Sequence, residues 1–215
     1  MPYSEAVEYI VSLLVFLLCW AVLSRVWPRR PDRQANAPPK DAPAPKRKAL
    51  SGTAVRQHIA GFPDAKVIEI IDGDTVDVAK QDRRVRIRLD SIDCPEDGQD
   101  WGDTAKYGLI KLIGGRNVRL EEHGLDIHGR TLATIYVQHP NADEYLNVNE
   151  RMVTLGHAWV SNKYYDHLPH DRQVKLNQLE VWARSKKIGL WRAANPIPPW
   201  RWRNQERDNK RPPAP

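Results

Sequence analysis

Cysteine is nearly absent from this sequence, since only Cys19 and Cys94 occur among its 215 residues. Cys19 lies within an apolar run and Cys94 lies within a charged, strand-like stretch, so no intramolecular disulfide is expected. The sequence also lacks Cys-x-x-Cys and His-x-x-x-His pairs. A zinc site built from Cys94, His123 and His128 is therefore not expected. These absences exclude a scaffold held together by disulfides and leave the redox compartment open.

The central part of the chain has little net charge. The whole sequence carries 33 basic and 27 acidic residues, a formal charge of +6, but residues 62–192 contain 19 basic and 21 acidic side chains. This part therefore has a net charge of −2 and the flanking segments have +8. Many of the 17 prolines also lie near the two ends. We expect one folded domain at 62–192 with basic flanks, which attract polyanions or anionic lipid without sequence preference.

Only one long apolar run occurs, at residues 9–27. It contains a single charge, Arg25, which can extend toward lipid head groups, and its length is marginal but sufficient for a bilayer span. The alternative is a secretory signal peptide that is removed. Residues 1–8 contain Glu5 and Glu8 but no basic residue, and no small-x-small cleavage site follows, which favours a retained transmembrane anchor.

The charges around this run predict an orientation. Acidic residues precede it, whereas Arg25, Arg29, Arg30 and Arg33 follow it. The positive-inside rule then places the remaining chain on the cytoplasmic side of the membrane. If the run acts as a signal instead, that domain is periplasmic or extracellular. Residues 28–61 are rich in proline, alanine and basic residues, so we expect a semi-extended linker there.

Residues 62–192 show the patterns of a small barrel with helices. Alternating or apolar runs predict five strands, at 66–71, 75–79, 84–89, 117–121 and 130–137. The alternation at 84–89 places Arg84, Arg86 and Arg88 on one solvent-exposed face. Helical patterns predict three helices: 101–113 with Asp100 or Asp103 as its cap, one that begins with a capping box at Asn147, and 169–187. The expected fold is α+β and mainly β, a five-stranded OB-type barrel with about three helices.

The tail at 193–215 is rich in proline, tryptophan and arginine. Its Trp200–Trp202 segment admits two interpretations. The tryptophans stack on single strands or lie in a membrane interface, or else the tail lies extended over the barrel.

Five residues in and after the first strands carry the chemistry that we expect. Asp74 and Asp93 offer carboxylates to a hard divalent cation, and Glu96 is placed to orient a water molecule. Arg88 and Arg130 present planar forks that suit phosphate oxygens. Each of these residues taken alone has an ordinary structural explanation, such as a turn, a cross-strand pair or a strand end. Their occurrence together predicts phosphodiester hydrolysis.

The motifs resemble those of the staphylococcal nuclease (thermonuclease) family. The similar stretches are Ile71-Asp72-Gly73-Asp74-Thr75-Val76, the segment from Arg88 through Asp93-Cys94-Pro95-Glu96, and Asp126-Ile127-His128-Gly129-Arg130. The resemblance runs from about residue 66 to 191 and implies calcium-dependent cleavage of DNA and RNA on a five-stranded OB barrel. It implies Asp74, Asp93 and the backbone carbonyl of Cys94 as calcium ligands, with Arg88, Glu96 and Arg130 as catalytic residues. Magnesium is a second candidate for the cation.

Two positions depart from the pattern of the best-known family member. Cys94 stands where that protein has threonine, which changes little if only the carbonyl binds the cation. His128 stands where it has tyrosine, which leaves substrate preference open. Tyr164 and Tyr165 are candidates for base stacking, but aromatic residues near a helix start are as often part of a core.

Together these patterns predict a membrane-anchored, metal-dependent endonuclease with low sequence specificity. The alternatives are a tethered, non-catalytic module that binds nucleic acid or protein, and an accessory protein that positions other components at the membrane. All five acidic and arginine positions are filled, which favours the enzyme.

Overall fold

The computed structural model describes residues 52–209. The predicted membrane span at 9–27 and most of the predicted linker at 28–61 lie outside this range. Within residues 52–209, no helix has the length and apolar character that a membrane span requires.

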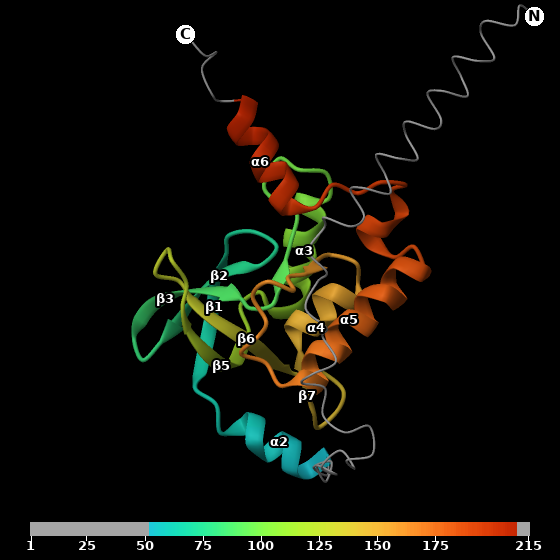
Figure 1. Cartoon of the computed structure of the whole chain (residues 1–215). Helices are drawn as coiled ribbons and strands as arrows, with labels where there is room; N and C mark the ends of the chain where they lie inside the picture. The colour runs from blue at the N-terminus through green and yellow to red at the C-terminus, as the bar shows by residue number, and fades with distance from the viewer. Residues whose placement is uncertain (1–51, 210–215) are drawn as a thin grey trace, which may run out of the picture. The chain divides into compact units, whose positions relative to one another are not determined.

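Five strands form a mixed barrel, as the sequence predicts (Figure 1). They are β1 (Asp64–Ile70), β2 (Thr75–Lys80), β3 (Arg83–Leu89), β5 (Asn117–Leu125) and β6 (Thr131–Gln138). Neighbours pair in antiparallel fashion in the order β3-β2-β1-β5-β6, and a parallel pairing of β3 with β6 closes the barrel. The short strand β7 (Tyr145–Asn147) pairs with β6 in antiparallel fashion, while β4 (Ile92–Asp93) pairs with β8 (Trp159–Val160).

The strand register brings the predicted motifs to one end of the barrel. Thr75 of β2 lies opposite Arg88 of β3. On its other side, Arg88 lies opposite Leu132 of β6, two residues after Arg130. Three stretches that are far apart in the sequence are therefore adjacent where β2, β3 and β6 meet.

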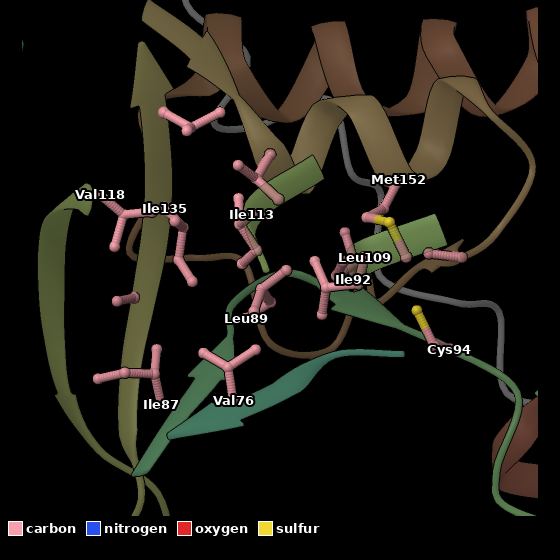
Figure 2. Close-up of a cluster of buried hydrophobic side chains, with 14 of the residues drawn as sticks. Val76, Ile87, Leu89, Ile92, Cys94, Leu109, Ile113, Val118, Ile135 and Met152 are labelled. Carbon is pink, nitrogen blue, oxygen red and sulfur yellow. The ribbon is translucent and has the colours of Figure 1, made fainter. Parts of the chain in front are cut away.

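The barrel interior continues into the core beneath the helices. Leu89 and Ile135 from the strands and Ile113 and Met152 from two helices belong to one hydrophobic cluster, and each of these four side chains is fully buried (Figure 2). Burial of an aliphatic side chain contributes about 1.5–3 kcal/mol relative to leaving it exposed. The strands that carry the polar motifs are held by this core, so the positions of the motif side chains follow from barrel packing.

Three helices and one short 3-10 turn accompany the barrel. They are α3 (Gly102–Ile113), α4 (Val148–Thr154), α5 (His170–Ser185) and η2 (Gly189–Arg192), and α4 packs against both α5 and β6. The predicted cap of α4 is confirmed, because the side chain of Asn147 accepts a hydrogen bond from the backbone N–H of Glu150 at 3.0 Å.

The predicted cap of α3 is wrong. The residue before this helix is Trp101, which has a left-handed backbone (φ 74°), and no side chain caps the helix. Asp103 already lies in the first turn, where its charge favours the positive end of the helix dipole without capping it.

Two more helices occupy segments that were expected to lack regular structure. Helix α2 (Gly52–Ala60) covers the end of the predicted linker, and helix α6 (Pro199–Asn209) covers half of the predicted tail. Proline density suggested extended chain in both flanks. Pro199, however, occupies the first turn of α6, where proline is compatible with a helix because no backbone N–H is needed there.

Candidate active site

The loop between β1 and β2 places Asp74 against the segment that contains Asp93. The carboxylate of Asp72 accepts a hydrogen bond from the backbone N–H of Asp74 at 2.8 Å, which fixes the turn. A Cβ atom on Gly73 would lie 2.7 Å from the Cβ of Cys94 and 2.9 Å from that of Ala105. Glycine is thus required here because two chain segments approach closely.

The Asp74 carboxyl is buried in a nest of donors. Its Oδ2 atom accepts a hydrogen bond from the backbone N–H of Cys94 at 2.7 Å and lies 3.1 Å from Nη1 of Arg88. Its Oδ1 atom accepts one from the Thr75 hydroxyl at 3.2 Å. Burial raises the pKa of Asp74 to about 7, because it outweighs the lowering effect of Arg88. A carboxyl in this position is stabilised in its ionised form by added positive charge.

Arg88 links the two aspartates. Its Nη2 atom donates to Oδ1 of Asp93 at 2.8 Å, while Nη1 donates to the carbonyls of Leu89 and Ile92 at 2.8 and 3.0 Å. Asp74 and Asp93 raise the pKa of Arg88 although burial acts to lower it. The guanidinium therefore stays charged and its plane is fixed between the two acids.

The expectation that Arg84, Arg86 and Arg88 share a solvent-exposed face is wrong for Arg88. The first two are half exposed and both bind Asp77, at 2.7 and 2.8 Å through their Nε atoms. The Arg88 side chain is only 14% exposed. Arg84 and Arg86 bind Asp77, whereas Arg88 binds Asp74 and Asp93 and is therefore largely buried.

Asp93 and Glu96 share an arginine that sequence reasoning missed. Arg203 of α6 contacts Asp93 through Nη2–Oδ2 at 2.9 Å and Nη1–Oδ1 at 3.3 Å, and it also forms an ion pair with Glu96. Asp93 is thereby bound by arginines on two sides. The only signal in the sequence was the arginine content of the Trp-rich tail, since 110 residues separate Arg203 from Asp93.

Helix α6 reaches this position through a few contacts with the domain. The side chain of Gln99 donates to the carbonyl of Ile197 at 2.6 Å, and Trp200 packs edge-to-face on Trp159 with ring centroids 6.4 Å apart. A cavity of about 430 Å³ lies beside the start of the helix, lined among others by Trp101, Leu190 and Trp202. The Trp200–Trp202 segment is thus helical and rests partly on the domain.

Arg130 approaches the same group of residues from the turn that leads into β6. The preceding Gly129 has φ 76° and makes the turn. The Asp126 carboxylate accepts hydrogen bonds from the Arg130 backbone N–H at 2.9 Å and from Nε at 2.7 Å. Nη1 reaches the Thr75 hydroxyl at 3.5 Å, and that hydroxyl bonds to Asp74. His128 is exposed in the turn.

The structure brings the predicted site residues together. A continuous series of contacts runs from Arg130 through Thr75 to Asp74, and from Asp74 through Arg88 to Asp93. Glu96 joins Asp93 through Arg203. Cys94 belongs to the same group by its backbone N–H and by its buried thiol, which contacts the Gly73 carbonyl at 3.2 Å. The roles of these residues as cation ligands and catalysts stay predictions.

The donor set fits a hard divalent cation. Asp74 and Asp93 provide carboxylate oxygens within reach of a common partner, since Arg88 binds both. Burial raises the pKa of Asp74 in spite of the nearby Arg88, so a bound cation would further stabilise its ionised form. No sulfur ligand faces the acids from the part of the chain that the structure describes, because the Cys94 thiol points to the Gly73 carbonyl. Arg203 forms an ion pair with the same Asp93 carboxylate that a cation would bind, so the two would compete for it.

Comparison with known proteins gives concordant matches. Residues 86–193 match the family model described as staphylococcal nuclease homologue. A micrococcal nuclease of Shigella flexneri is 38% identical over 146 residues, which cover 66% of this chain and 82% of that protein. An uncharacterized endonuclease of Haemophilus influenzae is 40% identical over 145 residues (67% and 75%), and protein ParB of Escherichia coli is 37% identical over 149 residues (68% and 81%).

Proposed function

The chain belongs to the staphylococcal nuclease family and is a thermonuclease-type phosphodiesterase, and on this premise we propose that it is a calcium-dependent endonuclease that cleaves DNA and RNA with low sequence specificity. The observation that carries the proposal is the contact series that joins Asp74, Arg88 and Asp93 to Arg130 and Glu96. Magnesium is the alternative cation for the same oxygens.

The residues of this group divide the work of hydrolysis. Asp74 and Asp93 would hold the cation, with the Cys94 carbonyl as a further ligand. When bound, the cation would polarise the phosphate and make water more acidic. Glu96 accepts the proton of the attacking water, whose oxygen forms the new bond to phosphorus as the ester P–O bond breaks. Arg88 and Arg130 donate to the phosphate oxygens, where negative charge increases in the transition state, and the leaving oxygen takes a proton from solvent.

The surface beside Arg130 supports low sequence specificity. Leu125 at the end of β5 is 70% exposed, and Ile127 in the turn before Arg130 is 95% exposed. Apolar side chains contact bases without reading the hydrogen-bonding groups that distinguish them, whereas the arginines bind the phosphate common to all nucleotides. Binding of this kind positions the backbone and tolerates any sequence.

Cleavage of labelled oligonucleotides by the purified full chain tests the proposal. Single-stranded DNA and RNA are incubated with CaCl₂ or MgCl₂, with and without excess EDTA. We expect fragments of many lengths in calcium and none after chelation. If the oligonucleotides bind but stay intact with both cations, the chain is the non-catalytic module and the proposal fails.

Removal of the Arg203 ion pairs should lower the calcium requirement. In Arg203→Ala, the cation no longer has to displace a guanidinium from Asp93 and Glu96. A partly exposed ion pair is worth up to about 1 kcal/mol, so the half-maximal calcium concentration for cleavage should fall by up to about fivefold. Arg201→Ala, an exposed position on the same helix, is the control and should match the wild type. A higher calcium requirement in Arg203→Ala would show that Arg203 assists the cation instead of competing with it.

We further propose that residues 9–27 anchor the protein in a membrane, with the nuclease domain on the cytoplasmic side. The support is the apolar run and the arginines that follow it. The chain should stay in the membrane fraction after alkaline carbonate extraction, and protease added to intact spheroplasts should leave the domain uncut. Release by carbonate contradicts the anchor, and digestion in intact spheroplasts contradicts the orientation.

A further inference from the structure

A second cluster of ligand-type side chains lies outside the candidate active site. It consists of Asp90, His123 and His167, whose nearest ligand atoms all lie within 4.8 Å of one another. Nε2 of His167 is 2.8 Å from Oδ2 of Asp90, and Nε2 of His123 is 3.8 Å from the same oxygen. The two imidazole rings have centroids 4.5 Å apart. The cluster contains His123 but neither Cys94 nor His128.

The three residues come from separate parts of the fold. Asp90 follows β3 directly, His123 lies in β5, and His167 lies in the loop before α5. Asp90 is almost fully buried, whereas the side chains of His123 and His167 are 13% and 28% exposed. The cluster therefore has a buried carboxylate at its base and an opening to solvent on the side of the histidines.

Neighbouring groups fix the orientation of the Asp90 carboxylate. Its Oδ1 atom accepts hydrogen bonds from the Thr134 hydroxyl at 2.8 Å and from Nδ2 of Asn149 at 2.7 Å. Asn149 is itself held, because its side-chain oxygen accepts from the backbone N–H of Ile135 at 3.1 Å. Oδ2, which also accepts from the Ser91 hydroxyl at 2.8 Å, is left facing both histidines. Outer partners that orient a ligating carboxylate in this way are a regular feature of metal sites.

The charges around the cluster are compatible with a bound cation. Burial acts to raise the pKa of Asp90, but hydrogen bonds from His167, Thr134 and Ser91 keep that pKa below its usual range, so the carboxylate is ionised. Burial lowers the pKa of His123 despite the opposing effect of Asp90, which favours the neutral imidazole that metals bind. A fixed positive charge close to the cluster is Arg172, which donates to the Thr134 hydroxyl at 2.9 Å. Both Glu121 oxygens lie 2.8 Å from Nη1 of Arg172 and offset its charge.

We propose that Oδ2 of Asp90, Nε2 of His123 and Nε2 of His167 bind one zinc ion. In a tetrahedral site with metal–ligand bonds of ~2.0–2.1 Å, the ligand atoms are about 3.3 Å apart. The two separations measured here from Oδ2, 2.8 and 3.8 Å, lie on either side of that value. Two imidazole nitrogens and one carboxylate oxygen suit zinc, whereas calcium and magnesium take oxygen ligands. Water completes the fourth position on the exposed side.

The zinc ion would join three segments that no disulfide connects. Asp90 lies two residues after Arg88 and three before Asp93. A metal bound there fixes the turn between those two active-site residues to β5 and to the chain before α5. This role is structural and does not depend on the proposed nuclease activity, so binding is measurable without calcium or nucleic acid.

Zinc titration of the metal-free full chain, prepared without an affinity tag, tests the site. ZnCl₂ is added in the presence of a chromophoric zinc indicator, and thermal unfolding is followed in parallel. We expect one zinc bound per chain at micromolar concentration together with a higher Tm. His123→Gln and His167→Gln should each weaken binding by about tenfold or more, since even loss of an outer-shell partner costs ~10–100-fold. His170→Gln, an exposed histidine three residues after His167, should bind as the wild type does.

Two results would overturn the proposal. One is a wild-type chain that binds no zinc at micromolar concentration, in which case Asp90 and His167 form an ordinary ion pair. The other is undiminished binding in both histidine variants, which would assign the zinc to another site. Circular dichroism shows whether the variants fold. If they do not, Co²⁺ bound to the wild-type chain decides, because strong visible absorption indicates the four-coordinate site and weak six-coordinate bands contradict it.

Discussion

Replacement of Arg88 by lysine should slow phosphodiester cleavage by about 100-fold or more at saturating calcium. Lysine keeps the positive charge between Asp74 and Asp93, but it cannot reproduce the fork that bonds to two backbone carbonyls and to Asp93. Loss of one transition-state donor typically costs ~2.7–4 kcal/mol. The rate is measured with excess enzyme over labelled DNA, so that product release does not mask the chemical step.

Arg86→Lys is the matched control for this variant. Arg86 lies on the same strand, is half exposed and binds Asp77 instead of the site acids. Its replacement should leave the rate within about twofold of the wild type, as surface substitutions usually have small effects. Undiminished cleavage by Arg88→Lys would show that Arg88 has no catalytic role and serves only as a structural ion-pair partner.

Replacement of Asp93 by asparagine should abolish most activity at physiological calcium. The change keeps the shape of the side chain and removes one of the two carboxylates proposed to hold the cation. Calcium affinity varies over decades with the charge of its ligands, so we expect the half-maximal calcium concentration to rise by about 100-fold or more. Cleavage is followed over a wide range of buffered free calcium, and partial recovery at high calcium would distinguish a ligand from a catalytic base.

Asp97→Asn controls for general electrostatic effects, because Asp97 is exposed and lies next to Glu96. It should shift the calcium dependence only slightly. An Asp93→Asn protein that cleaves with wild-type calcium dependence would exclude Asp93 as a ligand. Asp93→Asn also weakens ion pairs with Arg88 and Arg203, so its fold must be checked by its unfolding temperature.

The sequence predicted the barrel strands well because their pattern is local. The alternation in β3 and the Asn147 cap each depend on residues a few positions apart, and both are found in the structure. The predicted exposure of Arg88 was wrong because alternation indicates which face of the strand a side chain lies on. It does not indicate which other residues pack against that face. The buried acids on that side come from the β1–β2 turn and from β4, and their positions depend on barrel closure.

Contacts between residues far apart in the sequence could not be predicted from such local patterns. Arg203 meets Asp93 only because α6 forms and folds back onto the domain, and the proline-rich tail gave no sign of a helix there. His123 is not spaced from Cys94 and His128 in the sequence as the ligands of a zinc site usually are. Its actual neighbour His167 lies 44 residues away in a loop whose course depends on how α4 and α5 pack. The side-chain types in the sequence therefore indicate the chemistry, whereas tertiary packing determines which of these side chains contact one another.

A crystal structure of the full chain grown in saturating calcium tests the central claim most directly, with anomalous scattering used to locate the ion. The claim is that acids and arginines from separate segments form one cation-dependent reaction centre. The expected result is an ion bound by the carboxylates of Asp74 and Asp93, with Arg203 displaced from Asp93. If crystals of an active preparation show these two acids bound only by Arg88 and Arg203, with calcium elsewhere, the claim is contradicted.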